Sequence, residues 1–400
     1  MRPRPPVRLV PPSPSQLQGL PDPLWTVEFP AEVGADAPAA ALRLPYVREA
    51  SVVRVTSTRS NLLLLADAMQ AGRMKEADLL RRALSPPRWR LRTVELPMDW
   101  PHVMGIVNLT DDSFSGDGVG TDPSGALRRA EELRAAGATL IDVGAETARA
   151  DRPVLDAEAE AKVVATAVAA LAREGHVVSS DTYKPLVARA ALDSGAEVVN
   201  DISGLTLGLG AAAEAARAGA GYVLNYSYSV PKRRPDAPPL YADVVAETVS
   251  WMFERLAELE ASGLPFDQIC VDPGIAFGKS HDEDIQILRR LGELRSCGRP
   301  ILLAHSRKNF IGSVTGRVPA ERDLETHAAS ALAFAQGARI FRVHDAAGAR
   351  RALDLAAALT TAQPGDFAPG PESWPWASNT SAAHMTTAAP DKEPPKGQRW

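Results

Sequence analysis

The chain has 400 residues, of which 45% are hydrophobic and 23% charged, and these values match an ordinary globular protein with a large core. Its formal net charge of −5 gives no basis for a nucleic-acid or membrane surface, and no apolar run approaches the roughly 20 residues of a membrane span. The two cysteines, Cys270 and Cys297, are too few for a disulfide framework, so we expect a cytoplasmic protein.

The first hundred residues predict an N-terminal extension of mixed α and β structure. Residues 1–48 are rich in Pro and Ala, which indicates a partly extended and partly irregular segment. Residues 51–56 predict a strand. Residues 61–84 predict one long helix, because their apolar side chains fall near one face. Prolines then separate this extension, residues 1–100, from the rest of the chain.

The main region, residues 101–362, alternates short apolar runs with longer helix-compatible segments. Alternation of strand and helix predicts a parallel sheet. Eight such units in about 260 residues predict a closed (β/α)8 TIM barrel rather than an open doubly wound sheet. Residues 363–400 are rich in Pro, Ala, Ser and Thr without periodicity and predict a disordered tail. The predicted strands are residues 103–107, 139–143, 176–180, 197–201, 220–225, 268–272, 300–304 and 339–343.

Polar side chains follow most of these predicted strands. Alone, an acidic residue at a strand end more often caps the next helix, as Asp181 with Thr182 could do. Six polar strand ends sharing the carboxyl face of one barrel predict a single polar site instead. The first strand ends at Asn108, whose carbonyl oxygen suits a hard cation, and an Asp- and Ser-rich loop follows it.

The motifs at these strand ends together resemble those of the dihydropteroate synthases, in the family's order. The resemblance covers residues 102–362 and leaves out the first hundred residues and the tail. It implies a (β/α)8 barrel enzyme of folate synthesis, which joins 4-aminobenzoate to a dihydropterin methyl diphosphate and releases diphosphate. The matching segments are residues 104–118, 142–149, 181–184, 200–204, 272–280, 306–312 and 342–345.

The resemblance also assigns the pterin side of the site. A buried carboxylate can accept paired N–H donors from the pterin edge, and Asp272 is the candidate for this role. Asp181 and Asn200 would bind other parts of the ring. Lys308 would donate to ring acceptors and stack its stem on the pterin, while Arg307 beside it would face away.

Diphosphate release requires stabilisation of negative charge, and the resemblance gives this role to Asn108 with Mg²⁺, to Arg342 and to His344. Asp112 and Phe114, on the first loop, would shield the pterin methylene cation and help to bind 4-aminobenzoate. Catalysis would then consist mostly of charge stabilisation and positioning.

Further substrate contacts are expected from Thr147, Arg149, Phe277 and Asn309. Arg149 would either contact the aminobenzoate end or form a salt bridge between loops. The partners implied are the two small-molecule substrates and a second copy of the chain in a homodimer.

The chain departs from the family pattern mainly on the aminobenzoate side. Asp111 stands where the family has proline, and residues 147–150 read Thr-Ala-Arg-Ala in place of Ser-Thr-Arg-Pro. Asn225 and Tyr226 replace Met-His after the fifth strand, and Asn309 replaces a serine. These changes put the grip on aminobenzoate and the sensitivity to sulfonamides in doubt more than the reaction class.

Two alternatives remain open from the sequence. A non-catalytic relative would bind a pterin without synthesis. A methyltransferase acting on a methylated tetrahydrofolate would share the Asp and Asn contacts to the pterin, but it would not need Asn108, Lys308 or the pair Arg342 and His344.

Overall fold

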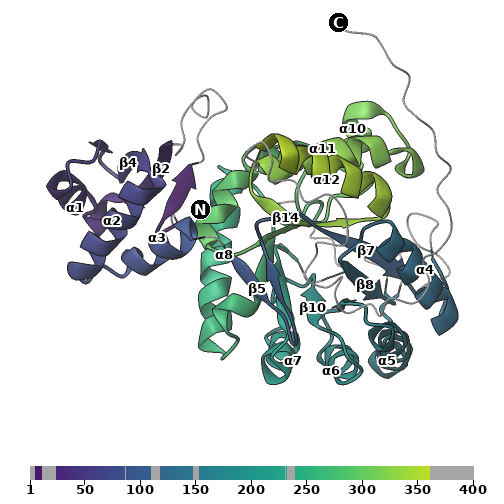
Figure 1. Cartoon of the computed structure of the whole chain (residues 1–400). Coiled ribbons are helices and arrows are strands. Elements are labelled where there is room, and N and C mark those ends of the chain that lie inside the picture. The colour runs from purple at the N-terminus through teal and green to yellow at the C-terminus, as the bar shows by residue number, and fades with distance from the viewer. Residues whose placement is uncertain are drawn as a thin grey trace, which may run out of the picture. The chain divides into compact units, whose positions relative to one another are not determined.

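Eight parallel strands close into a barrel in the computed structural model (Figure 1). They follow one another around the barrel in chain order, and the last strand pairs with the first. The predicted (β/α)8 barrel is therefore confirmed, and the open sheet is excluded. The strands are β7 (His102–Asn108), β8 (Leu140–Gly144), β9 (Val178–Asp181), β10 (Val198–Asp201), β11 (Gly221–Asn225), β12 (Ile269–Asp272), β13 (Ile301–Leu303) and β14 (Ala338–Val343).

The structure describes residues 5–10, 24–85, 87–109, 118–146, 153–229, 231 and 239–360. These residues belong to one compact unit. The tail predicted for residues 363–400 lies outside the described residues.

Helices surround the barrel, and α4, α5, α8 and α9 begin at capping side chains that the sequence supplies. The carboxylates of Asp122, Asp156 and Asp243 accept backbone N–H groups in the first turns of α4, α5 and α8, and Ser280 with Glu283 forms a capping box on α9. The surrounding elements are α4 (Pro123–Ala135), α5 (Ala157–Arg173), α6 (Pro185–Asp193), α7 (Gly210–Ala218), α8 (Val244–Ala261), η3 (Phe266–Gln268), α9 (His281–Arg289), η4 (Leu291–Cys297), α10 (Asn309–Thr315), η5 (Pro319–Glu321), α11 (Asp323–Ala335) and α12 (Ala346–Thr360).

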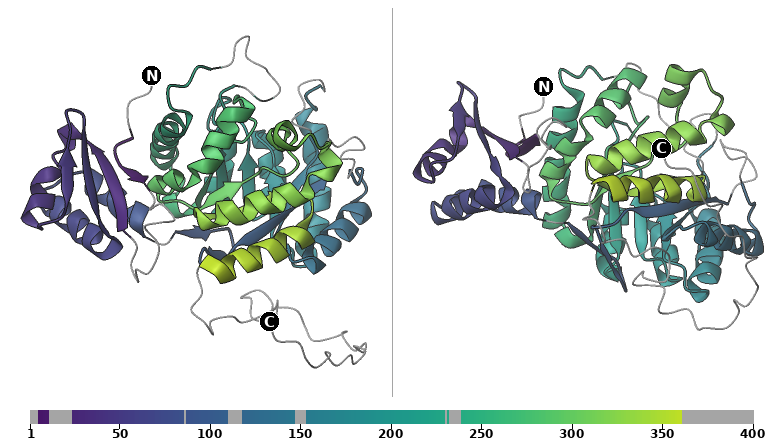
Figure 2. Two further views of the ribbon diagram at one scale, coloured as in Figure 1. Left: turned by 90° about the horizontal axis from the view of Figure 1, so that it is seen from above. Right: turned by 45° about the horizontal axis from the view of Figure 1, so that its top comes forward.

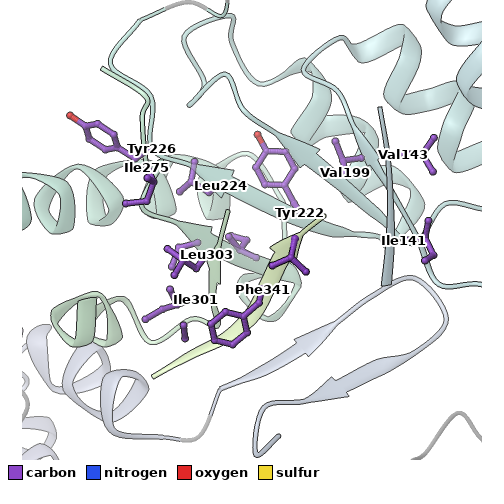
Figure 3. Packing of buried hydrophobic residues seen from close by; sticks show 14 of the residues in the cluster. Ile141, Val143, Val199, Tyr222, Leu224, Tyr226, Ile275, Ile301, Leu303 and Phe341 are labelled. Carbon is purple, nitrogen blue, oxygen red and sulfur yellow. The ribbon is translucent and has the colours of Figure 1, made fainter. Parts of the chain in front are cut away.

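Alternate residues of each strand face opposite sides of the barrel wall. On β7, Val103 and Val107 belong to the hydrophobic cluster that the strands share with the helices, whereas Met104 and Ile106 are buried outside it. Figure 3 shows part of this cluster. Met104 and Ile106 therefore face the barrel interior, as does Asn108, which continues their alternation.

A short hairpin that the sequence did not predict lies at the amino ends of the barrel strands. It pairs β5 (Arg88–Arg90) with β6 (Glu95–Pro97). Trp89 is fully buried and donates from Nε1 to the carbonyl oxygen of Gln268 at 2.8 Å. At Gly221, the first residue of β11, a Cβ would lie 2.6 Å from a methyl carbon of Leu91. Glycine at this position lets the hairpin approach the barrel.

The N-terminal extension contains a four-stranded antiparallel sheet in the order β1-β2-β4-β3, with helices against one face (Figure 2). The predicted strand at residues 51–56 corresponds to β4. The single helix predicted for residues 61–84 is wrong, because the chain forms two helices separated at Gly72, and Arg73 adopts a positive φ of 59°. The elements are β1 (Arg8–Val10), β2 (Leu24–Pro30), η2 (Ala31–Val33), α1 (Asp36–Ala41), β3 (Tyr46–Arg48), β4 (Val52–Thr58), α2 (Arg59–Ala71) and α3 (Glu76–Leu84).

Polar contacts join this extension to segments that precede barrel strands. Arg8 donates from Nε to Glu293 at 2.8 Å, and the backbone N–H of Leu9 donates to the hydroxyl of Ser296 at 2.7 Å. These contacts lie on η4, which precedes β13, so they are on the amino side of the barrel strands and not at the carboxyl ends. None of the helices within the described ranges is both long enough and apolar enough to cross a membrane.

Candidate active site

The carboxyl ends of the barrel strands carry the polar side chains that the sequence predicted. Asn108, Asp181 and Asp272 each end a strand, and Asn200 is the next-to-last residue of β10. On β8, Ile141 and Val143 belong to the outer hydrophobic cluster, so Asp142 between them faces the barrel interior. These side chains therefore share the inside of the barrel at one end, as the sequence predicted.

Arg342 on β14 forms one network with three of these groups. Its Nε donates to Oδ2 of Asp142 at 2.5 Å, and its Nη2 donates to Oδ2 of Asp181 at 2.7 Å. Asn200 donates from Nδ2 to the same Oδ2 of Asp142 at 3.0 Å. The sequence assigned Asp142 no role of its own, although Asp142 begins the motif segment 142–149 and lies within β8.

Burial and neighbouring charges shift the pKa values of the ionisable groups in this network. Burial raises the pKa of the Asp181 carboxyl above its usual range, more than the attraction of Arg342 lowers it, and the nearby charge of Asp142 adds to the rise. Burial disfavours the charge on Arg342, but its two carboxylate partners outweigh this effect and raise its pKa. Two acids for one guanidinium leave acceptor capacity, which suits a ligand that brings N–H donors.

Asp272 and Lys308 form a second group, on β12 and after β13. The backbone N–H of Gly274 donates to Oδ1 of Asp272 at 2.7 Å. The ammonium of Lys308 donates to the carbonyl oxygen of Ile275 at 2.7 Å and lies 5.0 Å from the centre of the Phe277 ring. Burial lowers the pKa of Lys308 to about 8, against the opposing attraction of Asp272. The predicted residues Asp272, Phe277 and Lys308 are thus brought together.

The loop after Asp272 takes an unusual backbone path. Gly274 has a φ of +64°, and a Cβ there would lie 2.0 Å from the carbonyl oxygen of Tyr226. Ala276 has a φ of 68°, and its N–H donates to the buried carboxylate of Asp284 at 2.9 Å. Only glycine fits the contact at residue 274, so this motif glycine shapes the loop that begins at Asp272.

Arg307 and Lys308 are neighbours that serve different purposes. Arg307 donates from Nε and Nη2 to the two carboxylate oxygens of Asp323, each at 2.7 Å. Lys308 has the contacts to the loop after Asp272 described above, as predicted. Asn309 has an exposed side chain whose Oδ1 accepts from Arg322 at 3.1 Å. The structure does not bring Asn309 to the other predicted residues.

His344 follows β14, and its ring is held by a neighbouring strand end. The hydroxyl of Ser306 lies 2.9 Å from Nδ1 of His344 and also accepts the backbone N–H of His344 at 3.3 Å. Asn108 ends β7, which lies between β14 and β8 in the barrel. Asn108 and His344 therefore follow neighbouring strands.

The predicted residues Asp112, Phe114, Thr147 and Arg149 lie outside the described residues, as do Asp111, Ala148 and Ala150. The residues that flank the second loop are described, and Lys184 joins them. Its ammonium donates to Glu146 at 2.8 Å, to Glu160 at 2.5 Å and to the carbonyl oxygen of Leu155 at 2.7 Å. The N–H of Leu155 donates to Glu146 at 2.6 Å. Sequence reasoning missed this buried cluster.

The departure at residues 225 and 226 has a structural role in the loop after Asp272. Asn225 donates from Nδ2 to the carbonyl oxygen of Tyr226 at 2.9 Å. The hydroxyls of Tyr226 and Tyr241 lie 2.8 Å apart, and the ammonium of Lys279 lies 3.9 Å from the centre of the Tyr226 ring. Lys279 also donates to the carbonyl oxygens of residues 273 and 274, each at 2.9 Å. Tyr226 therefore helps to hold this loop in place through its contact with Lys279.

Comparison with known proteins identifies similar chains. Residues 104–344 match the model of a family described as pterin binding enzyme. A dihydropteroate synthase from Escherichia coli (strain K12) is 36% identical over 269 residues, which are 67% of this chain and 95% of that protein. A dihydropteroate synthase from Mycobacterium leprae is 37% identical over 268 residues, 66% of this chain and 94% of that one.

Solved structures of similar sequence share the barrel. A Yersinia pestis dihydropteroate synthase with a sulfonamide drug complex has a TM-score of 0.65 at 32% identity, and the match covers 69% of this chain and 100% of that chain. A Burkholderia cenocepacia dihydropteroate synthase complexed with 7,8-dihydropteroate has a TM-score of 0.62 at 36% identity, with 68% and 96% covered.

Proposed function

The chain belongs to the dihydropteroate synthase family of pterin-binding enzymes, and we propose that the strand-end residues described above carry out its reaction. The enzyme condenses a (7,8-dihydropterin-6-yl)methyl diphosphate with 4-aminobenzoate. The bond between the methylene carbon and the diphosphate oxygen breaks, a bond from that carbon to the arylamine nitrogen forms, and the amine loses a proton. The products are 7,8-dihydropteroate and diphosphate.

We assign pterin binding to the two groups of residues described above, the network that contains Asp181 and Asn200 and the group formed by Asp272 and Lys308. Its adjacent N–H donors match the carboxylate of Asp272, and Asp181 and Asn200 would bind other edges of the ring. Lys308 would donate to ring acceptors. The observation that carries the proposal is the meeting of Asp272, Lys308 and Phe277, which joins an acceptor, a donor and an aromatic face at one place.

The diphosphate is assigned to Arg342, His344 and Asn108. The Nε–H and Nη2–H bonds of Arg342 that meet Asp142 and Asp181 lie on one edge of the guanidinium. The other edge, formed by the two terminal nitrogens, has the fork geometry that binds phosphate oxygens. Ser306 orients the ring of His344. Together these groups would stabilise the negative charge that develops on the leaving diphosphate.

Mg²⁺ is the cation expected in this family, and the single carbonyl oxygen of Asn108 suits a metal that would arrive with the substrate. Among the residues the structure describes, no three His, Cys, Asp or Glu side chains gather to hold a metal by themselves. Mg²⁺ usually keeps several waters and takes one or two protein oxygens together with substrate phosphates. Asn108 would supply such an oxygen, and bound Mg²⁺ would neutralise charge on the diphosphate.

The aminobenzoate side is assigned from sequence to Asp112, Phe114, Thr147 and Arg149. The clamp formed by Lys184 and Glu146 supports this assignment, because it ties together the two described ends of the segment that contains Thr147 and Arg149. A Thermus thermophilus relative of solved structure is complexed with 4-aminobenzoate, at 36% identity and a TM-score of 0.61. The bond from Arg322 to Asn309 uses only Oδ1, so the amide N–H groups of Asn309 would be the part that a substrate meets.

One assay tests the proposed function against its alternatives. Purified protein is incubated with pterin diphosphate, isotopically labelled 4-aminobenzoate and Mg²⁺, and labelled dihydropteroate is expected. Absence of product at every aminobenzoate concentration, with pterin still bound, would establish the non-catalytic alternative. Methyl transfer from a methylated tetrahydrofolate, without dihydropteroate, would establish the methyltransferase.

A homodimer is the expected assembly, and α11 and α12 offer the surface for it. Four leucines on these helices expose 61% to 77% of their surface. Because α11 and α12 pack against each other, these side chains would suit a protein–protein interface. Light scattering should give twice the chain mass, and substitution of these leucines by glutamate should give a monomer; they are Leu324, Leu332, Leu355 and Leu359.

A further inference from the structure

Asp142 is a buried carboxylate to which the proposed reaction gives no task. Its side chain has no exposed surface, and it lies inside the barrel on β8. Its Oδ2 accepts from both Arg342 and Asn200, at 2.5 and 3.0 Å. Its Oδ1 is also buried and has no hydrogen-bond partner among the described residues. Burying an ionised carboxylate is costly unless it is paired. The groups that are bonded to Asp142 therefore indicate what this side chain does.

The two carboxylates on Arg342 differ in their access to a ligand. Asp142 meets Nε and is completely buried, whereas Asp181 meets Nη2 and exposes 18% of its side chain. A substrate can therefore reach Asp181 and compete for it. Asp142 has no exposed surface, so a substrate cannot reach it while Arg342 and Asn200 remain bonded to it.

We propose that Asp142 is the fixed anchor of Arg342 and Asn200, and that Asp181 is the exchangeable partner which a bound pterin takes over. Asp142 is then a positioning residue, which acts on the diphosphate through Arg342 and on the pterin through Asn200. The proposal rests on the proposed function, since it concerns the same substrate.

Asp142 compensates the charge of Arg342 when the pterin binds to Asp181. When pterin N–H groups engage Asp181, Arg342 loses part of its compensation, and an uncompensated buried charge is strongly destabilising. The bond from Nε to Asp142 keeps one negative charge beside the guanidinium. It also keeps the guanidinium plane in place, so that the edge formed by the terminal nitrogens continues to face a phosphate.

The same anchor sets the direction of the Asn200 amide. Because Nδ2 donates to Asp142, the carbonyl oxygen of this amide must point the other way. The carbonyl oxygen of Asn200 is thereby available to a ligand as an acceptor. A pterin edge with N–H donors is the matching partner.

The test compares binding of two probes, the pterin methyl diphosphate and the corresponding hydroxymethyl pterin, by calorimetry. Both probes contact Asp181 and Asn200, but only the diphosphate uses Arg342. For Asp142→Asn we expect the preference for the diphosphate to fall by about 10- to 100-fold, by analogy with the loss of a group that orients a metal ligand. Turnover should fall in parallel, with the KM for 4-aminobenzoate little changed.

Asp201→Asn is the matched control. Asp201 is equally buried, on β10, but it accepts from Tyr222 and Ser203, and Arg342 bonds to Asp142 and Asp181 and not to Asp201. It should lose stability without losing the diphosphate preference. An equal loss of preference in both variants would overturn the proposal.

A double variant keeps the test decisive if Asp142→Asn is too unstable to study. Asp142→Asn combined with Arg342→Met removes both partners and leaves less uncompensated charge. If Asp142 acts on the diphosphate through Arg342, the preference in the double variant equals that in Arg342→Met alone. A further loss in the double variant would overturn the proposal. Failure of the wild type to make dihydropteroate would instead overturn the proposed function, and the binding preference would still test the anchor.

Discussion

The ammonium group of Lys308 lies 5.0 Å from the centre of the Phe277 ring, although the two residues follow different strands. The same ammonium donates to the backbone of Ile275, two residues before Phe277. Burial in these surroundings disfavours the positive charge and lowers the pKa of Lys308 to about 8. This relationship makes the pterin site sensitive to pH.

We predict that kcat/KM for the pterin diphosphate falls as the pH rises through about 8. Below this pKa Lys308 is protonated and donates to the pterin, and above it the charge and one N–H are lost. Initial rates across the pH range should show this alkaline limb. In Lys308→Arg the cation keeps its proton, so the limb should move to higher pH even if the rate is lower. If the alkaline limb of the pH profile stays at the same pH in that variant, the titration belongs to another group.

The magnesium dependence should rely on Asn108. We expect Asn108→Ala to lower turnover at a fixed Mg²⁺ concentration by about 10- to 100-fold and to raise the Mg²⁺ concentration needed for half of the maximal rate. The melting temperature should stay near that of the wild type, because Asn108 ends its strand and does not lie in the core. An unchanged Mg²⁺ titration would remove Asn108 from its proposed role.

Lys184 should support the binding of 4-aminobenzoate. Lys184→Met leaves Glu146 and Glu160 buried without their cation, which costs about 3–5 kcal/mol in pairs of this kind. The variant also removes the side chain that joins the two described ends of the second loop, at Glu146 and Leu155. The KM for 4-aminobenzoate should therefore rise more than the KM for the pterin. Urea unfolding and initial rates measure the two effects. Lys184→Arg, which keeps the charge, should recover part of both; equal increases in the two KM values would contradict the role in the loop.

Gly274→Ala should be far more damaging than Gly175→Ala. Both glycines have positive φ, of +64° and +76°, so both variants incur the left-handed backbone strain of about 1–2 kcal/mol. The added Cβ meets the Tyr226 carbonyl oxygen at 2.0 Å in the first case and nothing within 4 Å in the second. Thermal unfolding of the two variants isolates the clash. We also expect loss of pterin affinity only in Gly274→Ala, and similar melting temperatures would show that the loop adapts.

Two tryptophans allow the extension and the barrel to be compared. Trp89 is fully buried against the amino ends of barrel strands, and Trp25 is 8% exposed in the core of the extension. Each change to alanine should cost about 3–5 kcal/mol. Only Trp89→Ala should lower turnover, because its hairpin supports β11 and β12, which carry Asn225 and Asp272. Loss of turnover in Trp25→Ala, measured below its melting temperature, would indicate that the extension contributes to the active site.

The barrel was predictable from sequence because its signal is local and repeated. Each apolar run that ends in a polar residue marks one strand, as in the run that ends at Asn108, and the eight predicted strands agree with the observed ones to within a few residues. The hairpin around Trp89 was missed because its strands have three residues each, too short for a visible alternation. The break at Gly72 was missed because both flanking helices share one apolar face.

The sequence by itself determined the barrel, the end of it that carries the polar residues, and the family to which those residues point. Only the tertiary structure decided how they are partnered: Arg342 with Asp142 and Asp181, Lys308 with the loop after Asp272, and Asn309 with Arg322. Periodicity and motifs record which face of a strand a residue occupies, since that depends on neighbours in the chain. Hydrogen-bond partners come from strands and loops far apart in sequence, so they exist only once the barrel has closed.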